Sequence, residues 1–435
     1  MDPIFLGIIG LLALLILIAL GIHVPVALSL IGFLGIIMVS GVNPALQILG
    51  WLPYSALALF AFVTLPLFIL MGEFAHYTGA SKSAFETSYR WLGHLTGGLA
   101  MAVTAACALF AACSGSSIAA SATMAKLSLP ELKKYGYDRG FASGLIAASG
   151  SLAALIPPSV ILILYAMLTQ QSLVKLLLAG FIPGVLSAFF YIGGIYFLVR
   201  IKPSLGPEKV YFTWKERVKF LPGIAGIVLI MAFVIGGMYL GVFTASEAAA
   251  TGSILTLGMA VSKKTISLPI LRESLKSTCV TTCSVFFIVL GAFIFGRFLS
   301  LSGLTALLIN TISTLEVPRI FILGGLGIVF LMLGSILEAA SMLAVSLPIV
   351  FPVIISLGYD PIWFGIIVVK MTEIAVITPP LGLNVYAVKS VIGDEVSLGT
   401  IFKNILPFLC LDILTVIILI IFPQIVLFLP SRFAG

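Results

Sequence analysis

Two Pro-Pro pairs interrupt apolar stretches of the sequence, in "AALIPPSVILILY" at residues 153–165 and in "AVITPPLGLNVY" at 375–386. A proline inside a helix removes a backbone donor and clashes with the preceding turn, at a cost of about 3 kcal/mol. Each pair is therefore expected to break a helix and to leave backbone carbonyls without helical partners. In a membrane, such backbone is tolerated only where it is buried in protein or lines a polar cavity.

A serine-rich stretch, "ACSGSSIAASAT" (112–123), is a second source of oxygen ligands. It is too polar to face lipid, but it suits a helical hairpin that enters the membrane and turns back. Ser hydroxyls and free carbonyls are hard ligands that suit Na⁺. The alternative is that Ser and Gly only allow close helix packing. The hairpin arms are expected at about 96–112 and 117–128 in the first half, and at 319–333 and 336–349, turning at Gly334-Ser335, in the second.

Membrane helices must hold these stretches in place. Of the 435 residues, 61% are hydrophobic and 9% are charged, and the mean hydropathy is +1.24. A water-soluble chain of this length does not need so much apolar surface. Runs at 4–22, 221–243 and 405–429 reach or nearly reach the roughly 20 residues that cross a bilayer as helix. The first run lacks a basic leader and a cleavage site, so we expect a spanning helix there.

The excess of basic residues lies in loops. The segment "RIKPSLGPEKVYFTWKERVK" (200–219) holds six Lys or Arg against two Glu, and "KKTISLPILRESLK" (263–276) is also basic. The positive-inside rule places both segments in the cytoplasm, with two crossings between them. Topology therefore explains the net charge of +7, and no nucleic-acid partner is expected.

An internal repeat surrounds the two Pro-Pro pairs, which are 222 positions apart. The other matching landmarks recur in the same order: "GEFAHYTGA" (72–80) with "GRFLSLSGL" (296–304), "SGSSIAASATMAKLSLP" (114–130) with "LGSILEAASMLAVSLP" (333–348), and "YGYD" (135–138) with "LGYD" (357–360). Helices broken at corresponding positions of two repeats indicate the binding site of a secondary transporter.

The predicted fold is an all-α polytopic membrane protein with two pseudo-symmetric, inverted repeats, each with a re-entrant hairpin and an unwound helix. The repeats are expected at 51–200, with a hairpin at about 96–128 and a broken helix at about 140–168, and at 280–435, with a hairpin at about 319–349 and a broken helix at about 362–392. Scaffold helices at 1–50, a cytoplasmic basic loop at 201–219 and connecting scaffold helices at 220–279 complete the division.

The order of "SGSS", "GYD" and "LIPPS", then "GS", "GYD" and "ITPPLGLN", resembles the large membrane subunit of tripartite ATP-independent periplasmic (TRAP) transporters over essentially the whole chain. The resemblance implies a Na⁺-coupled elevator transporter of a wider ion-transporter superfamily, spanning the bacterial inner membrane. It implies a small membrane subunit and a periplasmic substrate-binding protein as partners, with lipids around them. The implied cargo is a small carboxylate-bearing solute, such as a C4-dicarboxylate, sialic acid or another organic acid.

The resemblance also implies site residues. Na⁺ is expected at each hairpin tip, facing backbone oxygens of the adjacent break: Ser114, Ser117, Ala153, Ile156 and Pro157 in the first site, and Gly334, Thr372, Ala375, Thr378 and Pro379 in the second. Ala153 stands where the family pattern leads us to expect glycine, a change that a carbonyl ligand survives. Substrate is expected between the sites, where half-helix N-termini face an anionic group, near Ser116, Pro158, Ser335, Glu338, Pro380 and Asn384.

Several charged residues lie in or near the predicted spans, where burying an unpaired charge is expensive. Lys370 and Glu373 are one helical turn apart and could neutralise each other. Glu73 and Arg297 occupy equivalent repeat positions and are expected at the membrane interface. Asp412 is assigned no partner, and Glu338, just past the second tip, is the first of these residues to test.

Other classes of protein fit less well. The five cysteines lack metal-site spacing, no Gly-rich phosphate loop follows a strand pattern, and no Ser/His/Asp set stands out. The sequence therefore favours neither an ATP-driven pump nor a membrane enzyme. One rival stays open: a self-sufficient Na⁺- or H⁺-coupled organic anion transporter of the same superfamily, acting without a binding protein.

Overall fold

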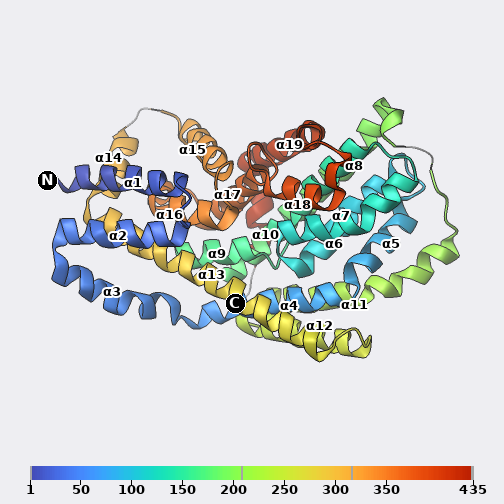
Figure 1. Cartoon of the computed structure of the whole chain (residues 1–435), viewed down its shortest axis with the longest axis horizontal. Helices are drawn as coiled ribbons and strands as arrows, with labels where there is room; N and C mark the ends of the chain where they lie inside the picture. Colours follow the sequence, from blue (N-terminus) through green and yellow to red (C-terminus); the bar gives the residue numbers. More distant parts are fainter. Residues whose placement is uncertain (1, 207–208, 315–316, 433–435) are drawn as a thin grey trace.

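The computed structural model describes residues 2–206, 209–314 and 317–432, and the regular structure in these ranges is helical (Figure 1). This confirms the predicted all-α class. The helices are α1 (Pro3–Ala19), α2 (Val24–Ser40), α3 (Val42–Leu57), α4 (Thr64–Tyr77), α5 (Ala80–Leu92), α6 (Gly98–Ser114), α7 (Ser117–Lys134), α8 (Arg139–Ser151), α9 (Val160–Thr169), α10 (Leu173–Ile201), α11 (Trp214–Tyr239), α12 (Ala245–Ser262), α13 (Leu268–Leu301), α14 (Leu304–Thr314), α15 (Arg319–Gly334), α16 (Ala339–Ser356), α17 (Pro361–Ala375), α18 (Leu383–Ile392), α19 (Leu398–Ile421) and α20 (Gln424–Ser431).

Six helical segments of the described chain are long and apolar enough to cross a membrane. They are Phe60–Tyr77, which includes α4, and the helices α10, α11, α13, α16 and α19. Much of their surface is not covered by the rest of the chain: only 22% of the apolar window in α11 is buried, against 56% in α10. Large exposed side chains such as Phe233 and Leu229 on α11 are consistent with a lipid-facing surface.

Both halves of the chain repeat one order of elements. The series α4, α5, α6, α7, α8, break, α9, α10 is followed after α11 and α12 by α13, α14, α15, α16, α17, break, α18, α19. The hairpin of α6 and α7 lies in the right half of Figure 1 and that of α15 and α16 in the left half, with α9, α10 and α17 between them. The sequence repeat therefore corresponds to a repeat of structure.

The repeated Gly-Tyr-Asp motif is a helix stop followed by a helix start. Gly136 and Gly358 have positive φ angles, +74° and +78°, and end α7 and α16. Asp138 accepts the Phe141 amide at 2.7 Å to cap α8, and Asp360 accepts the Ile362 and Trp363 amides at 2.8 and 2.9 Å to cap α17. Glycine past a C-terminus and aspartate at an N-cap satisfy the backbone groups that helix ends leave free.

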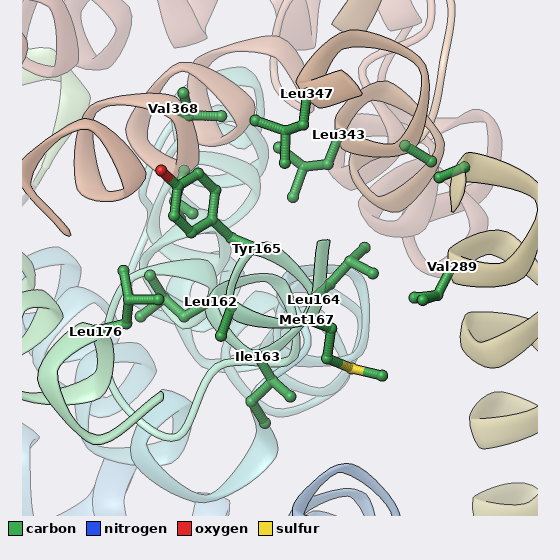
Figure 2. Close-up of a cluster of buried hydrophobic side chains, with 14 of the residues drawn as sticks. Leu162, Ile163, Leu164, Tyr165, Met167, Leu176, Val289, Leu343, Leu347 and Val368 are labelled. Carbon is green, nitrogen blue, oxygen red and sulfur yellow. The ribbon is translucent and has the colours of Figure 1, made fainter. Parts of the chain in front are cut away.

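The two repeats exchange the helices that follow their breaks. α9, from the first repeat, packs on α16 and α17 of the second, whereas α18, from the second, packs on α7 and α8 of the first. Figure 2 shows the α9 side chains Leu162, Leu164 and Tyr165 among residues of α10, α16 and α17. The Tyr165 hydroxyl also donates to the Pro361 carbonyl at 2.8 Å. Neither hairpin is therefore completed by its own repeat alone.

Helix α13 runs for 34 residues and packs along α2, α4, α16 and α9. The boundary that the sequence suggests at residue 280 lies inside this unbroken helix, and the boundaries at 50 and 219 lie inside α3 and α11. Connectors and repeats are therefore joined through continuous helices, because a membrane helix ends where its caps lie and not where a repeat begins.

Candidate functional site

The first hairpin turns at Ser114, Gly115 and Ser116, and its tip docks onto the first break. The Val160 amide, at the start of α9, donates to the Gly115 carbonyl at 3.5 Å. Gly115 has a φ of +62°, and a Cβ on it would lie 2.8 Å from the Pro158 carbonyl oxygen. Glycine satisfies both the left-handed conformation and the close approach. The turn therefore brings the serines against the Pro157-Pro158 segment.

The two predicted serine ligands differ in their surroundings. The half-buried Ser114 hydroxyl donates to the Ser116 carbonyl at 3.2 Å, and the Ser116 amide donates back to it at 3.3 Å. Ser117 is the half-buried first residue of α7. Both hydroxyls are thus at the tip, and that of Ser114 is held by the turn itself.

The first break is buried throughout, from residue 151 to residue 159. The carbonyls of Ala153, Ile156 and Pro157 accept no hydrogen bond from the described residues. The Ser159 hydroxyl donates to the Ala154 carbonyl instead. Buried carbonyls without a partner are uncommon because the missing bond costs free energy. Three neutral oxygens of this kind fit the donor set of a hard cation.

The second hairpin docks onto the second break in a similar way. α15 ends at Gly334, and a Cβ on this residue would collide with the side chain of Ala375, the last residue of α17. The Thr378 amide donates to the Ala375 carbonyl at 3.1 Å, and the Thr378 hydroxyl donates to the Ile374 carbonyl at 2.6 Å. The Ser335 hydroxyl donates to the Met332 carbonyl of its own helix at 2.8 Å.

The predicted ligands of the second site have more hydrogen-bond partners than those of the first. The Thr372 carbonyl accepts the Val376 amide at 3.0 Å, and the Thr372 hydroxyl donates to the Val368 carbonyl at 2.9 Å. The carbonyls of Thr378 and Pro379 accept no hydrogen bond from the described residues. A carbonyl has two lone pairs, so the bonded ones keep room for a second contact.

Asn384 is fully buried where α18 meets the first repeat. Its Nδ2 donates to the Ala147 carbonyl of α8 at 3.2 Å, and its backbone amide donates to the Val376 carbonyl at 3.1 Å. Its Oδ1 has no partner among the described residues. Asn384 therefore ties the second break to the first repeat and leaves one buried acceptor oxygen open.

A cavity of about 390 Å³ adjoins the first tip. Ser114 and Ser116 line it on one side, and Glu73 of α4 and Ser277 of α13 line it on the other. The Ser277 hydroxyl donates to the Glu73 carboxylate at 2.6 Å. The remaining polar lining residues are His76, Tyr77, Thr123, Glu273 and Thr281.

A second cavity of about 550 Å³ adjoins the second tip. Glu338 and Ser341 line it from the hairpin, opposite His23 at the start of α2 and Ser284 of α13. Helix α13 therefore lines both cavities, with Ser277 and Ser284 separated by two helical turns on one face.

The structure thus distributes the predicted substrate residues over several places. Ser116 lines the first cavity and Glu338 the second. Pro158 is buried against the first tip, Pro380 is exposed, and Asn384 is buried between the repeats. Their role in substrate binding stays a prediction.

A buried charge cluster joins three helices between the two breaks. The Lys370 ammonium lies 2.6 Å from the Glu373 carboxylate and 2.8 Å from that of Asp412, and all three side chains are fully buried. The Tyr191 hydroxyl of α10 donates to the second Asp412 oxygen at 2.7 Å. The expected pairing of Lys370 with Glu373 is confirmed. The partnership with Asp412 and Tyr191 was missed, because nothing in residues so far apart in the chain signals their contact.

A surface ion pair also links the repeats. Glu395, between α18 and α19, lies 3.0 Å from Lys133 and 2.9 Å from Arg139 of the first repeat. The Lys133 ammonium, followed by the Arg139 guanidinium, holds the pKa of this exposed carboxylate below its ordinary value. Sequence reasoning missed this link as well.

The chain is similar to known transport proteins over nearly its whole length. The family described as "Tripartite ATP-independent periplasmic transporter, DctM component" matches residues 11–425. The C4-dicarboxylate TRAP transporter large permease protein DctM of Pseudomonas aeruginosa is 32% identical over 90% of this chain and 93% of its own. The sialic acid TRAP transporter large permease protein SiaM of Vibrio cholerae is 31% identical over 94% and 96%.

A solved structure shares the fold. The crystal structure of the YdaH transporter of Alcanivorax borkumensis superimposes with a TM-score of 0.65 and 14% identity, covering 98% of this chain and 100% of that one. At this identity the likeness concerns the fold alone. The match over residues 11–425 and the permease relatives show that the chain belongs to the DctM component family of the tripartite ATP-independent periplasmic transporters, the large permeases that span the inner membrane in many passes.

Proposed function

We propose that this permease couples the inward movement of Na⁺ to the uptake of a small carboxylate-bearing solute. The observation that carries the proposal is the first break, where the buried Ala153, Ile156 and Pro157 carbonyls accept no hydrogen bond from the described residues and a serine-bearing tip docks onto the same segment. A hard monovalent cation supplies the missing interactions without requiring a negatively charged ligand. The second break repeats the arrangement with the Thr378 and Pro379 carbonyls.

Movement of substrate is proposed to follow an elevator mechanism. The two hairpins and two breaks are interlocked by the Asn384 bond to Ala147, the Tyr165 bond to Pro361 and the exchanged helices. Such a unit moves as one body more readily than as separate gates. Helix α13 lines the cavities at both tips, so it is the proposed fixed wall past which the unit carries its cargo.

The partners and the cargo are proposed from the family and its relatives. The family description names a tripartite periplasmic transporter, which supports a small membrane subunit and a periplasmic substrate-binding protein beside this chain. Two similar permeases are named for C4-dicarboxylate and for sialic acid, both of which bear carboxylates. The solute is proposed to be an organic acid of this chemical class, delivered by the binding protein.

Uptake into proteoliposomes tests the proposal. Permease reconstituted with its small subunit is given labelled C4-dicarboxylate or sialic acid, with the binding protein and an inward Na⁺ gradient. Uptake is expected to need both additions. Ser114→Ala removes a tip oxygen, and we expect a several-fold higher Na⁺ concentration for half-maximal uptake with an unchanged amount of protein. Thr378→Ala is expected to do the same at the second site.

Two results would contradict the proposal. Uptake that is equally fast when choline replaces Na⁺ would show that solute uptake is not coupled to Na⁺. Full uptake by the permease without a binding protein would instead favour the self-sufficient organic anion transporter.

A further inference from the structure

The cluster of Lys370, Glu373, Asp412 and Tyr191 holds more acidic than basic groups. One ammonium faces two carboxyl groups, all with fully buried side chains, so one negative charge is left over when both carboxyl groups are ionised. The Glu373 Oε1 atom has no hydrogen-bond partner among the described residues. An isolated buried charge is expensive unless another charge compensates it. A cation elsewhere in the protein interior would compensate this remaining negative charge.

Nearby helices do not supply that cation from their interiors. Three of the helices that contact α17 contain no charged residue, namely α9, α16 and α20. The other charged residues of α10, α15 and α19 lie in their first or last turns, or near them: Lys175, Arg200, Arg319 and Lys403. Within the described residues, these helices therefore provide no second basic side chain in their interiors for the second carboxyl group.

The cluster adjoins both breaks. Glu373 lies one residue after Thr372 and two before Ala375, at the end of α17. Helix α17 also contacts the turn Leu152–Ala154 of the first break. On α10, the helix of Tyr191, Gly180 lies against the Leu155 carbonyl and Gly184 against Ile156. The residues that hold the cluster therefore belong to helices that form the walls of the two breaks.

The predicted Na⁺ sites would have an excess of positive charge when the ions are bound. Their ligands are hydroxyls and backbone carbonyls, which carry no negative charge, so each bound ion would bring one buried positive charge. In the low dielectric of a protein interior, charges interact over longer distances than in water and are little screened by salt. At the equivalent positions of the first repeat, Lys370 and Glu373 are replaced by Ala148 and Ser151. The charged cluster is thus present once, between two uncharged sites.

We propose that Lys370, Glu373 and Asp412 act as the counter-charge that favours Na⁺ at the breaks. The inference rests on the proposed Na⁺ coupling and adds the source of the electrostatic attraction. Glu373 and Asp412 are positioning residues in this scheme, since they act on the ion through the field and touch no cargo. The alternative is a purely structural cluster that only holds α10, α17 and α19 together.

The test separates charge from hydrogen bonding. Thermal denaturation of the purified permease in detergent is followed while NaCl replaces choline chloride at constant ionic strength, which gives a Na⁺ midpoint for each variant. Glu373→Gln and Asp412→Asn keep the side-chain shape but remove the excess negative charge. Each is expected to raise the midpoint about tenfold, equivalent to about 1.4 kcal/mol. Tyr191→Phe removes a hydrogen bond but no charge, and its midpoint is expected to stay within about twofold of the parent's.

A double variant provides the matching control. Lys370→Gln combined with Glu373→Gln restores the excess of one negative charge, so its midpoint is expected to return towards that of the parent. Midpoints unchanged in Glu373→Gln and Asp412→Asn, with only the Na⁺-free melting temperature lowered, would overturn the proposal and leave a structural cluster. A parent protein with no Na⁺-dependent shift would overturn the proposed coupling itself, a result that the variants cannot imitate.

Discussion

The two breaks share a motif but not an environment. The first is buried from residue 151 to residue 159, whereas Pro379 and Pro380 of the second are exposed. The covering helix accounts for the difference. Helix α10 presents Gly180 and Gly184 to the first break, and the positions 222 residues later on α19 hold Phe402 and Leu406. A helix with large side chains cannot approach a backbone as closely as one with glycines.

The two halves thus share the broken helix but pack it differently. The first break has unpartnered carbonyls inside a closed wall, and the second has partly bonded carbonyls near an open surface. A substitution in the first break can therefore be accommodated only by shifts of the closely packed residues around it. A change in the second half can be relieved by movement towards the open side.

Replacement of the proline pairs is expected to have the largest effect. With alanine at 157 and 158, or at 379 and 380, new amides can donate to the carbonyls four residues earlier, which include Ala153 and Ala375. Each double variant is expected to insert normally and to lose most uptake and most Na⁺-dependent stabilisation, since a ligand stabilises only the state that binds it. Melting temperature against Na⁺ concentration measures this.

The same measurement ranks the two halves. We expect Pro157→Ala/Pro158→Ala to change the melting temperature without Na⁺ more than Pro379→Ala/Pro380→Ala, because only the first pair is enclosed. A variant that keeps the full Na⁺ shift and full uptake would show that its prolines shape packing alone.

Substitution of the tip glycines is expected to have an intermediate effect that sharpens the contrast. Gly115→Ala combines a left-handed φ with a clash against the Pro158 carbonyl, and we expect a loss of about 1–3 kcal/mol. Gly334→Ala meets the Ala375 side chain but does not have to adopt a left-handed φ, so a smaller loss, of about 1 kcal/mol, is expected. Thermal denaturation in detergent compares both with Gly324→Ala on α15, where a new Cβ has no neighbour within 4 Å. Equal losses of stability in Gly115→Ala and Gly334→Ala would show that the two hairpin tips do not differ in their tolerance of a side chain.

Glu395→Gln is expected to have the smallest effect. The carboxylate joins the halves through Lys133 and Arg139 at the surface, where ion pairs contribute little. Its lowered pKa means that any stabilisation exists above the ordinary glutamate pKa and is lost as the pH falls through the depressed value. A small difference in melting temperature from the parent is expected at neutral pH, and it should vanish in acid or at high salt. A difference that persists at low pH would assign Glu395 another role.

Residue types alone predicted the elements that rest on local chemistry. The Pro-Pro pairs predicted the two breaks, and "SGSS" predicted a turn between α6 and α7. The sequence showed "GYD" only as a repeated landmark, and the structure explains it, because each copy ends one helix and caps the next. These features depend on backbone donors and permitted φ angles within a few residues. The predicted Lys370 and Glu373 pair belongs to the same local class.

Features that depend on which helices become neighbours were not predictable. Asp412 reaches Lys370 and Tyr191 only because α10, α17 and α19 meet, and Asn384 reaches Ala147 only because α18 crosses to the other repeat. The burial of the first break likewise depends on the approach of α10. Hydropathy indicates that a helix lies in the membrane but does not identify its partner.

The exchange of α9 and α18 has a consequence for biogenesis. The first repeat is synthesised well before α16 and α17. Until these two helices are made, the apolar side chains of α9 must contact lipid or another segment of the chain. The hairpin of α6 and α7 likewise lacks its packing partner α18 until late, because α18 is among the last helices made. Assembly is thus completed from the C-terminal end, and a chain truncated before residue 383 leaves both repeats unfinished, although every residue of the first has been synthesised.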